Sequence, residues 1–207
     1  AAYAAAVNET RALGGAASTV RTAEQMEVAR FHTEPPPPAI TRNLGRFAAS
    51  TAHVGEAARL MAMVYVSYVD AICACFEAKY HYQTWRPVSA IQMAEADGND
   101  GTAPDTVWAP SLLTPNHPEY PAAHSCTSGS VGEALRSFYG TPDVTFTWDS
   151  TVTKTTRTYA GIEAFNAEAG LARLHGGMHF RHSVVAGEEL GRRVAQWVTQ
   201  RHFARQD

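Results

Sequence analysis

The sequence predicts an all-α fold, a helical bundle with one small β-hairpin. Apolar residues recur at spacings of three and four through several long segments, as they do on the buried face of a helix. Two short runs, Val144–Trp148 and Thr155–Tyr159, are the exception and are expected to pair as the hairpin. The composition, 45% hydrophobic and 18% charged over 207 residues, is that of a globular chain with a core for one domain.

The first half of the chain predicts three helices. Thr22–Gln25 has the spacing of a capping box and opens a helix to about Phe31. The run Pro35–Pro38 predicts an extended connector, because successive prolines cannot continue a helix. Helices over about 40–49 and 55–82 follow, the second being the long central helix. We therefore divide the single domain, 1–207, into an N-terminal helix with its Pro-rich connector (1–38) and a bundle (39–207).

The second half predicts further helices around a long loop. A short helix follows Pro87, and a loop rich in proline and glycine covers residues 95–120. Helices over 121–139 and 159–174 come next. The last helix is expected to run to about His202, with a buried stripe made of Leu190, Val194, Trp197 and Val198.

Charge and hydropathy exclude several classes of protein. Seventeen Lys and Arg against 20 Asp and Glu argue against a nucleic-acid binder, which shows a basic excess. The apolar run Leu60–Val69 has ten residues before Asp70 interrupts it, whereas a membrane span needs about 20. No span is therefore expected. The segment Ala1–Val7 lacks the basic start of a signal peptide, and a secreted or periplasmic location is expected only if processing removed such a leader.

The central helix carries a cation on its buried face. Its apolar stripe, continued through Phe76, places Lys79 among buried positions, and Arg86 lies about two turns further on the same side. Pro87 is expected to end the helix there. A buried cation is costly unless an anion compensates it. Two interpretations stay open: an ion pair with a carboxylate elsewhere, or a site that binds an oxyanion.

Histidines accompany further candidates for that site. Gly176–Gly177 should break a helix just after Arg173, which places His179 where the last helix begins. Helix N-termini bind anions through free N–H groups. His124 follows a proline-stiffened loop and enters the first turn of the next helix. Taken alone, each histidine is better explained as a structural residue.

Together these residues form an ordered signature. Lys79-x6-Arg86-Pro87, Pro121-Ala-Ala-His124 and Arg173-x5-His179 follow one another along the chain. The sequence resembles the type-2 phosphatidic-acid phosphatase and vanadium-dependent haloperoxidase superfamily, and most of all its soluble bacterial haloperoxidase-like branch. The resemblance implies a helical bundle of the haloperoxidase/acid phosphatase type, with residues 39–207 cradling phosphate or vanadate. Chains of that branch carry a further helical portion before the point where this one starts, so a longer natural chain and a homo-oligomer both stay open.

The resemblance also implies roles for single residues. Lys79, Arg86 and Arg173 match the clamps on the oxyanion, and the backbone N–H of Ala123 is a further donor. His179 matches the residue that binds the vanadium of vanadate or attacks phosphorus. His124 matches the general acid–base. The implied partners are hydrogen peroxide, a halide and a small organic substrate.

A halide pocket is expected beside the signature. His117 stands seven positions before the acid–base histidine, where the resemblance implies a residue lining the halide side, and Phe76 is assigned to the same pocket. In the family, histidine there accompanies oxidation of bromide and not of chloride. The alternative is a loop histidine that faces solvent between Pro115 and Pro118.

The chain departs from the family pattern at several positions. Ala122-Ala123 stands where the family has Ser-Gly, which removes a hydroxyl contact to the oxyanion. Ala172 replaces a serine before Arg173. Ser183 replaces the Asp four residues beyond His179, whose carboxylate orients that ring. Three functions remain: a vanadate-dependent haloperoxidase oxidising bromide or iodide, a soluble acid phosphatase with a phosphohistidine intermediate, and a non-catalytic oxyanion-binding or structural protein. The likeness along the whole chain favours the first, and the missing Asp counts against the second.

Overall fold

The computed structural model describes residues 1–204 and confirms an all-α bundle with one hairpin. Its helices, in chain order, are α1 (Ala2–Gly14), α2 (Ala23–Phe31), α3 (Pro36–Ala49), α4 (Val54–Tyr82), α5 (Pro87–Gln92), α6 (Ala123–Tyr139), α7 (Ile162–His175) and α8 (Arg181–His202), with a short 3-10 turn at Ala94–Ala96. The strands β1 (Phe146–Ser150) and β2 (Thr155–Tyr159) pair antiparallel, with Phe146 opposite Tyr159.

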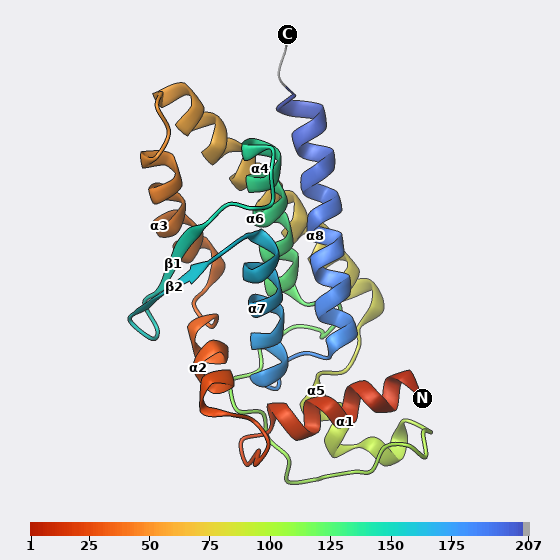
Figure 1. Cartoon of the computed structure of the whole chain (residues 1–207). Coiled ribbons are helices and arrows are strands. Elements are labelled where there is room, and N and C mark those ends of the chain that lie inside the picture. The colour runs from red at the N-terminus through yellow and green to blue at the C-terminus, as the bar shows by residue number, and fades with distance from the viewer. Residues whose placement is uncertain (205–207) are drawn as a thin grey trace.

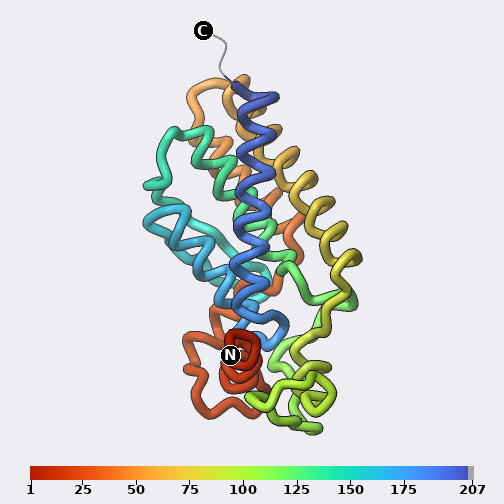
Figure 2. Tube along the Cα trace, turned by 90° about the vertical axis from the view of Figure 1, so that its right-hand side faces the viewer, coloured from red at the N-terminus to blue at the C-terminus, as the bar shows by residue number. Residues whose placement is uncertain are grey.

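The bundle is built around α6. This helix packs against α4, α7 and α8, and the four run roughly alongside one another (Figure 1). Helix α1 lies across one end of the bundle and is seen end-on in Figure 2. That end also holds α5 and the loops before α6 and α8 (Figure 1). Loops at the end of a rigid bundle are where side chains from several helices converge.

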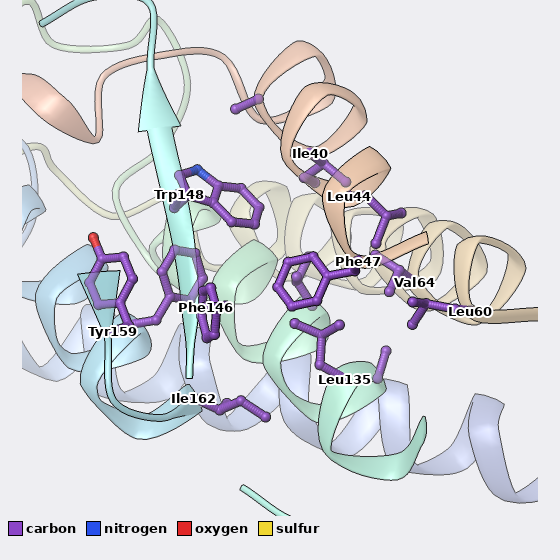
Figure 3. Close-up of a cluster of buried hydrophobic side chains, with 14 of the residues drawn as sticks. Ile40, Leu44, Phe47, Leu60, Val64, Leu135, Phe146, Trp148, Tyr159 and Ile162 are labelled. Carbon is purple, nitrogen blue, oxygen red and sulfur yellow. The ribbon is translucent and has the colours of Figure 1, made fainter. Parts of the chain in front are cut away.

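The main apolar core lies between α3, α4, α6, α7 and the hairpin (Figure 3). Aromatic rings dominate it: the Phe47 and Phe146 ring centroids lie 5.3 Å apart, and those of Trp148 and Phe165 4.9 Å apart. Such pairs add to the free energy of burial. The hairpin thus contributes core residues through β1 and covers α7 and α3.

Helix α8 contacts α6 through small residues and not through the stripe expected from the sequence. Trp197 is 55% exposed, so that part of the prediction was wrong, although Val198 is buried. The buried face includes Gly187, Gly191 and Ala195. A Cβ added at Gly191 would lie 2.0 Å from the carbonyl oxygen of Cys126. The reason is close backbone approach, which favours glycine over bulky side chains.

The N-terminal region departs from expectation in two ways. Residues 2–14 form α1, a helix that the sequence analysis did not predict. The proline run is not an extended connector, because α3 begins at Pro36. Proline is tolerated in the first helical turn, where its missing N–H has no intrahelical acceptor. The boundary placed at residue 38 therefore falls inside α3, while the capped helix α2 ends at Phe31 as predicted.

One stretch within residues 1–204 is long and apolar enough to cross a membrane by length and composition. It covers residues 54–92, and its most apolar window of 18 residues has a mean hydropathy of 1.5 and is 33% buried. The sequence analysis had counted only the ten residues before Asp70. A core helix of a soluble protein passes the same test, so this is weak evidence for a membrane. The absence of a span stays a prediction.

Candidate functional site

Three buried cations converge at the end of the bundle, and we call them with His179 the cradle. Lys79 lies in the last turn of α4 and Arg173 in the last turn of α7. Arg86 is not on α4, as the sequence analysis expected. That helix ends at Tyr82, Gln83 takes a left-handed conformation, and Arg86 becomes the N-cap of α5. Pro87 begins a helix here and does not end one, because its fixed φ suits the first helical position.

Backbone carbonyl oxygens surround these cations. Lys79 Nζ donates to the carbonyl oxygens of Pro118 (2.8 Å) and Glu119 (2.9 Å). Arg86 donates to those of His117 and Met178, both at 2.8 Å. Carbonyl groups satisfy hydrogen bonds but carry no charge to neutralise a buried cation. The cradle therefore keeps a positive charge that protein dipoles only partly offset.

Carboxylates do not pair with these cations. Among residues 1–204, neither lysine nor arginine of the cradle lies within 4.0 Å of a carboxylate oxygen. The nearest acidic influence on Lys79 and Arg86 is Glu119, and its carboxylate contacts His179 instead. Within residues 1–204 the structure therefore shows no ion pair of the kind that the first interpretation expected. An uncompensated buried positive charge favours an anion from outside the chain.

Burial weakens the hold of these groups on their protons. It lowers the pKa of Lys79 to about 8, with a further contribution from the charge of Arg86. Burial likewise lowers the pKa of Arg86 to about 10 and that of Arg173 to about 9. A bound oxyanion reverses these shifts, since an opposite charge at close range favours the charged form.

The ring of His179 lies between the carboxylate of Glu119 and the guanidinium of Arg86. Its Nδ1 lies 3.0 Å from Oε1 of Glu119, and its Nε2 lies 2.9 Å from the NH1 group of Arg86. An arginine N–H only donates, so Nε2 accepts. We therefore assign the proton to Nδ1, which donates to Glu119. Burial, followed by the charges of Arg86 and Lys79, holds the pKa of His179 well below its usual range, so the ring is neutral.

The loop between α7 and α8 sets this position. After α7 ends at His175, Gly177 has φ +76°, a left-handed conformation that glycine adopts without a steric penalty. A Cβ at that residue would lie 2.4 Å from the carbonyl oxygen of Gly14 in α1. The turn brings the Met178 carbonyl to Arg86 and His179 to the cradle. The prediction that the glycine pair ends the preceding helix is confirmed.

His124 lies in the first turn of α6, as predicted, close enough to Arg173 for its charge to act on the ring. It also lines a cavity of about 50 Å³ between α2, α3, α6, α7 and β1, together with His32. Burial first, then the charges of Arg173 and His32, holds the pKa of His124 well below its usual range. Its Nε2 is buried without a hydrogen-bond partner among residues 1–204. A neutral imidazole with a free nitrogen suits proton transfer.

Unsatisfied polar atoms in the cradle fit an oxyanion. The Nε of Arg173 is buried and, within the described part of the chain, lacks an acceptor. Its NH2 group donates only to the sulfur of Met178, a weak acceptor, at 2.9 Å. Buried polar groups without a partner call for an explanation. Phosphate or vanadate oxygens would supply the missing acceptors, so the residues present fit such a group.

The comparison with known proteins identifies a family. Residues 59–206 match the family of the VCPO second helical-bundle domain. The chain belongs to this family. The match contains every cradle residue together with His124, so the resemblance inferred from the three motifs is confirmed.

Individual relatives are vanadium haloperoxidases. Vanadium chloroperoxidase of Curvularia inaequalis is 30% identical over 95 residues, which is 40% of this chain and 14% of that protein. The crystal structure of a bacterial vanadium-dependent iodoperoxidase matches with a TM-score of 0.71 and 25% identity, over 86% of this chain and 44% of that one. A holo-type bacterial vanadium-dependent chloroperoxidase, at 18% identity, shows the fold alone, with a TM-score of 0.73 and coverage of 97% and 48%. The chain thus spans less than half the length of these relatives.

Two further predicted residues of this VCPO-family chain lie beside the cradle. His117 is half-buried, and its Nδ1 accepts from the NH2 group of Arg86 at 3.0 Å. Its ring centroid lies 5.0 Å from that of Phe76. Burial, followed by the charges of Lys79 and Arg86, lowers the pKa of His117 to about 4. The structure thus brings together the pair assigned to the halide pocket and places His117 against Arg86 instead of in open solvent.

The start of α6 offers backbone donors. Ala123 is the first residue of the helix, and the first N–H groups of a helix have no intrahelical acceptor. The N–H of Ala122 is already engaged, since it donates to the carbonyl oxygen of Ser183 at 2.9 Å. The N–H of Ala123 belongs to the first turn of α6, whose first intrahelical bond runs from Cys126 to Ala122, so its assignment as an oxyanion donor stays a prediction.

Sequence reasoning missed Glu119. This residue is 1% exposed and contacts the cradle through both its carboxylate and its carbonyl oxygen. The search for an orienting carboxylate had considered only the position of Ser183. A signal was present, since an acidic residue stands in the proline-stiffened segment just before His124.

Oxyanion affinity is expected to depend on pH through Lys79. We expect the association constant for sulfate, which keeps its charge above neutral pH, to fall as pH rises through about 8, because Lys79 then loses its proton. By the same linkage, sulfate binding takes up protons near that pH. Calorimetric titration between pH 6.5 and 9.5 measures both effects. Lys79→Met is the control, with weak binding that no longer varies near pH 8. A constant wild-type affinity across that interval would contradict the expectation.

Proposed function

We propose that this chain carries the vanadate-binding site of a haloperoxidase that oxidises bromide or iodide with hydrogen peroxide. The observation that supports this most is the set of three buried cations around a neutral His179, whose Nε2 accepts from Arg86, with no carboxylate paired to these cations within residues 1–204. Membership of the VCPO family, together with the likeness to vanadium haloperoxidases, supports vanadate as the oxyanion that binds there. The chain spans less than half the length of these relatives, so the activity of the whole protein is part of this proposal.

Each residue then has a defined task. Lys79, Arg86 and Arg173 would hold the oxygens of the oxyanion, where preorganised cations stabilise negative charge at little reorganisation cost. The Nε2 of His179, which accepts from Arg86 in this structure, would be the ligand to vanadium. His124 gives or takes protons at its free nitrogen. The chemistry supplied by bound vanadate is the activation of hydrogen peroxide towards a halide, and a small organic substrate accepts the oxidised halogen.

A soluble acid phosphatase is the second candidate, and one observation favours it. A phosphatase of this superfamily relies on a carboxylate that holds its nucleophilic histidine, and the absence of Asp at position 183 counted against that activity. Glu119 places a carboxylate 3.0 Å from Nδ1 of His179. The nucleophile in that mechanism would be Nε2 of His179, which forms a bond to phosphorus as the bond from phosphorus to the leaving oxygen breaks; that oxygen takes a proton from His124 in its imidazolium form. A non-catalytic oxyanion binder is the third candidate.

One comparison separates the three candidates. The purified protein is assayed with vanadate, peroxide and bromide, and separately with a chromogenic phosphomonoester. Vanadate activates a haloperoxidase and inhibits a phosphatase, whereas a binder shows neither activity but still takes up phosphate. Bromide oxidation that requires added vanadate is the expected result. Hydrolysis of the ester, inhibited by vanadate, would replace our proposal by the second candidate.

Halide preference is expected to follow from His117. A neutral imidazole next to Arg86 donates or accepts a hydrogen bond near the reacting oxygens, which a hydrocarbon ring cannot do. We expect turnover of bromide and iodide and little of chloride. Halogenation of a phenolic dye is measured with each halide at equal concentration, and His117→Phe is compared with the wild type. Chloride turnover comparable to bromide in the wild type would refute the role assigned to His117.

A further inference from the structure

We propose that Glu119 is the positioning residue for His179, in place of the Asp that the family carries four residues beyond this histidine. The inference rests on the proposed oxyanion site but not on which reaction occurs there. It assigns a role to a residue that lies 60 positions away in the sequence, outside α8 and its first turn. The position of the missing Asp, Ser183, becomes a partner of that same carboxylate.

The carboxylate of Glu119 accepts hydrogen bonds at both oxygens. Oε1 accepts from Nδ1 of His179 at 3.0 Å and from the backbone N–H of Phe180 at 2.9 Å. Oε2 accepts from the hydroxyl of Ser183 at 2.5 Å. All these groups are buried. Three donors aimed at one buried carboxylate fix its position, and charge-assisted bonds of this kind are the stronger ones.

The presence of serine and not aspartate at position 183 has an electrostatic reason. An Asp at 183 would put a second carboxylate against Glu119, and two like charges in a buried site cannot both ionise without a large cost. A serine there instead donates its hydroxyl to Oε2. One carboxylate is needed beside His179, and it can be supplied from either segment. In this chain the loop before α6 supplies it.

Glu119 also connects the histidine to a clamp. Its carbonyl oxygen accepts from Nζ of Lys79 at 2.9 Å, while its side chain holds Nδ1 of His179. On the other side of the ring, Arg86 donates to Nε2. The Nδ1–H tautomer leaves the Nε2 lone pair directed at the cation side of the cradle. Glu119 therefore orients the ligand or nucleophile without touching the oxyanion.

The decisive experiment moves the carboxylate back to α8. Three variants are made: Glu119→Ala, Glu119→Ser, and the double variant Glu119→Ser with Ser183→Asp. The ¹⁵N chemical shifts of His179 report its tautomer, and calorimetric titration with inorganic phosphate reports oxyanion affinity. In the single variants we expect loss of the pure Nδ1–H signature and a phosphate affinity reduced about 10- to 100-fold, the usual effect of removing such a partner. The double variant is expected to restore both.

Controls separate positioning from folding. Ser183→Ala keeps the carboxylate, so the tautomer signature should persist with a smaller loss of affinity. Glu119→Gln retains the shape and an acceptor oxygen, and is expected to fall between wild type and Glu119→Ala; it serves if the alanine variant does not fold. Wild-type His179 spectra in Glu119→Gln and Glu119→Ser would overturn the proposal. So would a folded double variant with the same spectrum as Glu119→Ser. Neither measurement requires turnover, so failure here is distinct from failure of the proposed function.

Discussion

Arg173→Ala is expected to abolish detectable binding of vanadate and phosphate while the helical fold stays largely intact. Arg173 is 2% exposed and has an Nε without an acceptor within residues 1–204, so its charge is available to an oxyanion. Removing one partner of a buried charge pair costs about 3–5 kcal/mol, which is a loss of affinity of about 10²- to 10⁴-fold. Lys79→Ala is expected to act in the same direction.

In Arg173→Ala and Lys79→Ala, oxyanion affinity is expected to fall strongly while thermal stability changes little. The cost of burying an uncompensated cation disappears with the side chain, so the melting temperature is expected to fall little in the absence of ligand. Arg181→Ala provides the matched control, because Arg181 is exposed, pairs with Glu9 and lies close in sequence to His179. It removes the same charge without touching the cradle. If Arg173→Ala and Lys79→Ala both kept their phosphate affinity, the assignment of the clamp would fail.

His179→Ala is expected to eliminate all turnover, whereas His124→Ala is expected to lose only the part that proton transfer supplies. In the proposed function the Nε2 of His179 bonds to vanadium or phosphorus, so no substitute remains in its absence. General acid–base catalysis contributes about 10²- to 10⁴-fold, and His124→Ala should lose that factor in kcat while it retains oxyanion binding. Rates and vanadate affinity are measured side by side for both variants.

His182→Ala is the control for the histidine pair. Its ring is exposed and stacks with Phe180 at 5.6 Å between centroids, outside the cradle. Activity close to wild type is expected. The opposite pattern, in which His124→Ala loses all binding and His179→Ala keeps turnover, would reverse the two assigned roles.

Local patterns in the sequence predicted most of the helices. The capping box at Thr22 and the apolar periodicity of α4 depend on residues within a few positions of one another, and both were confirmed. The hairpin was also confirmed, because its strands are close in sequence. Two of the errors came at prolines, because proline can stop one helix or start another. Pro36 and Pro87 both occupy first helical positions, and only the course of the neighbouring chain decides between these two uses.

The cations and histidines of the site were determined by the sequence itself, because their motif spacing identifies them without coordinates. The family match contains all of them. Only the tertiary structure decided what surrounds them. Within residues 1–204, Lys79 has carbonyl oxygens and no carboxylate as partners, and His179 receives its carboxylate from Glu119, 60 residues away. Hydrogen bonds between distant segments depend on how loops pack at the end of the bundle, and no periodicity along the chain encodes that packing.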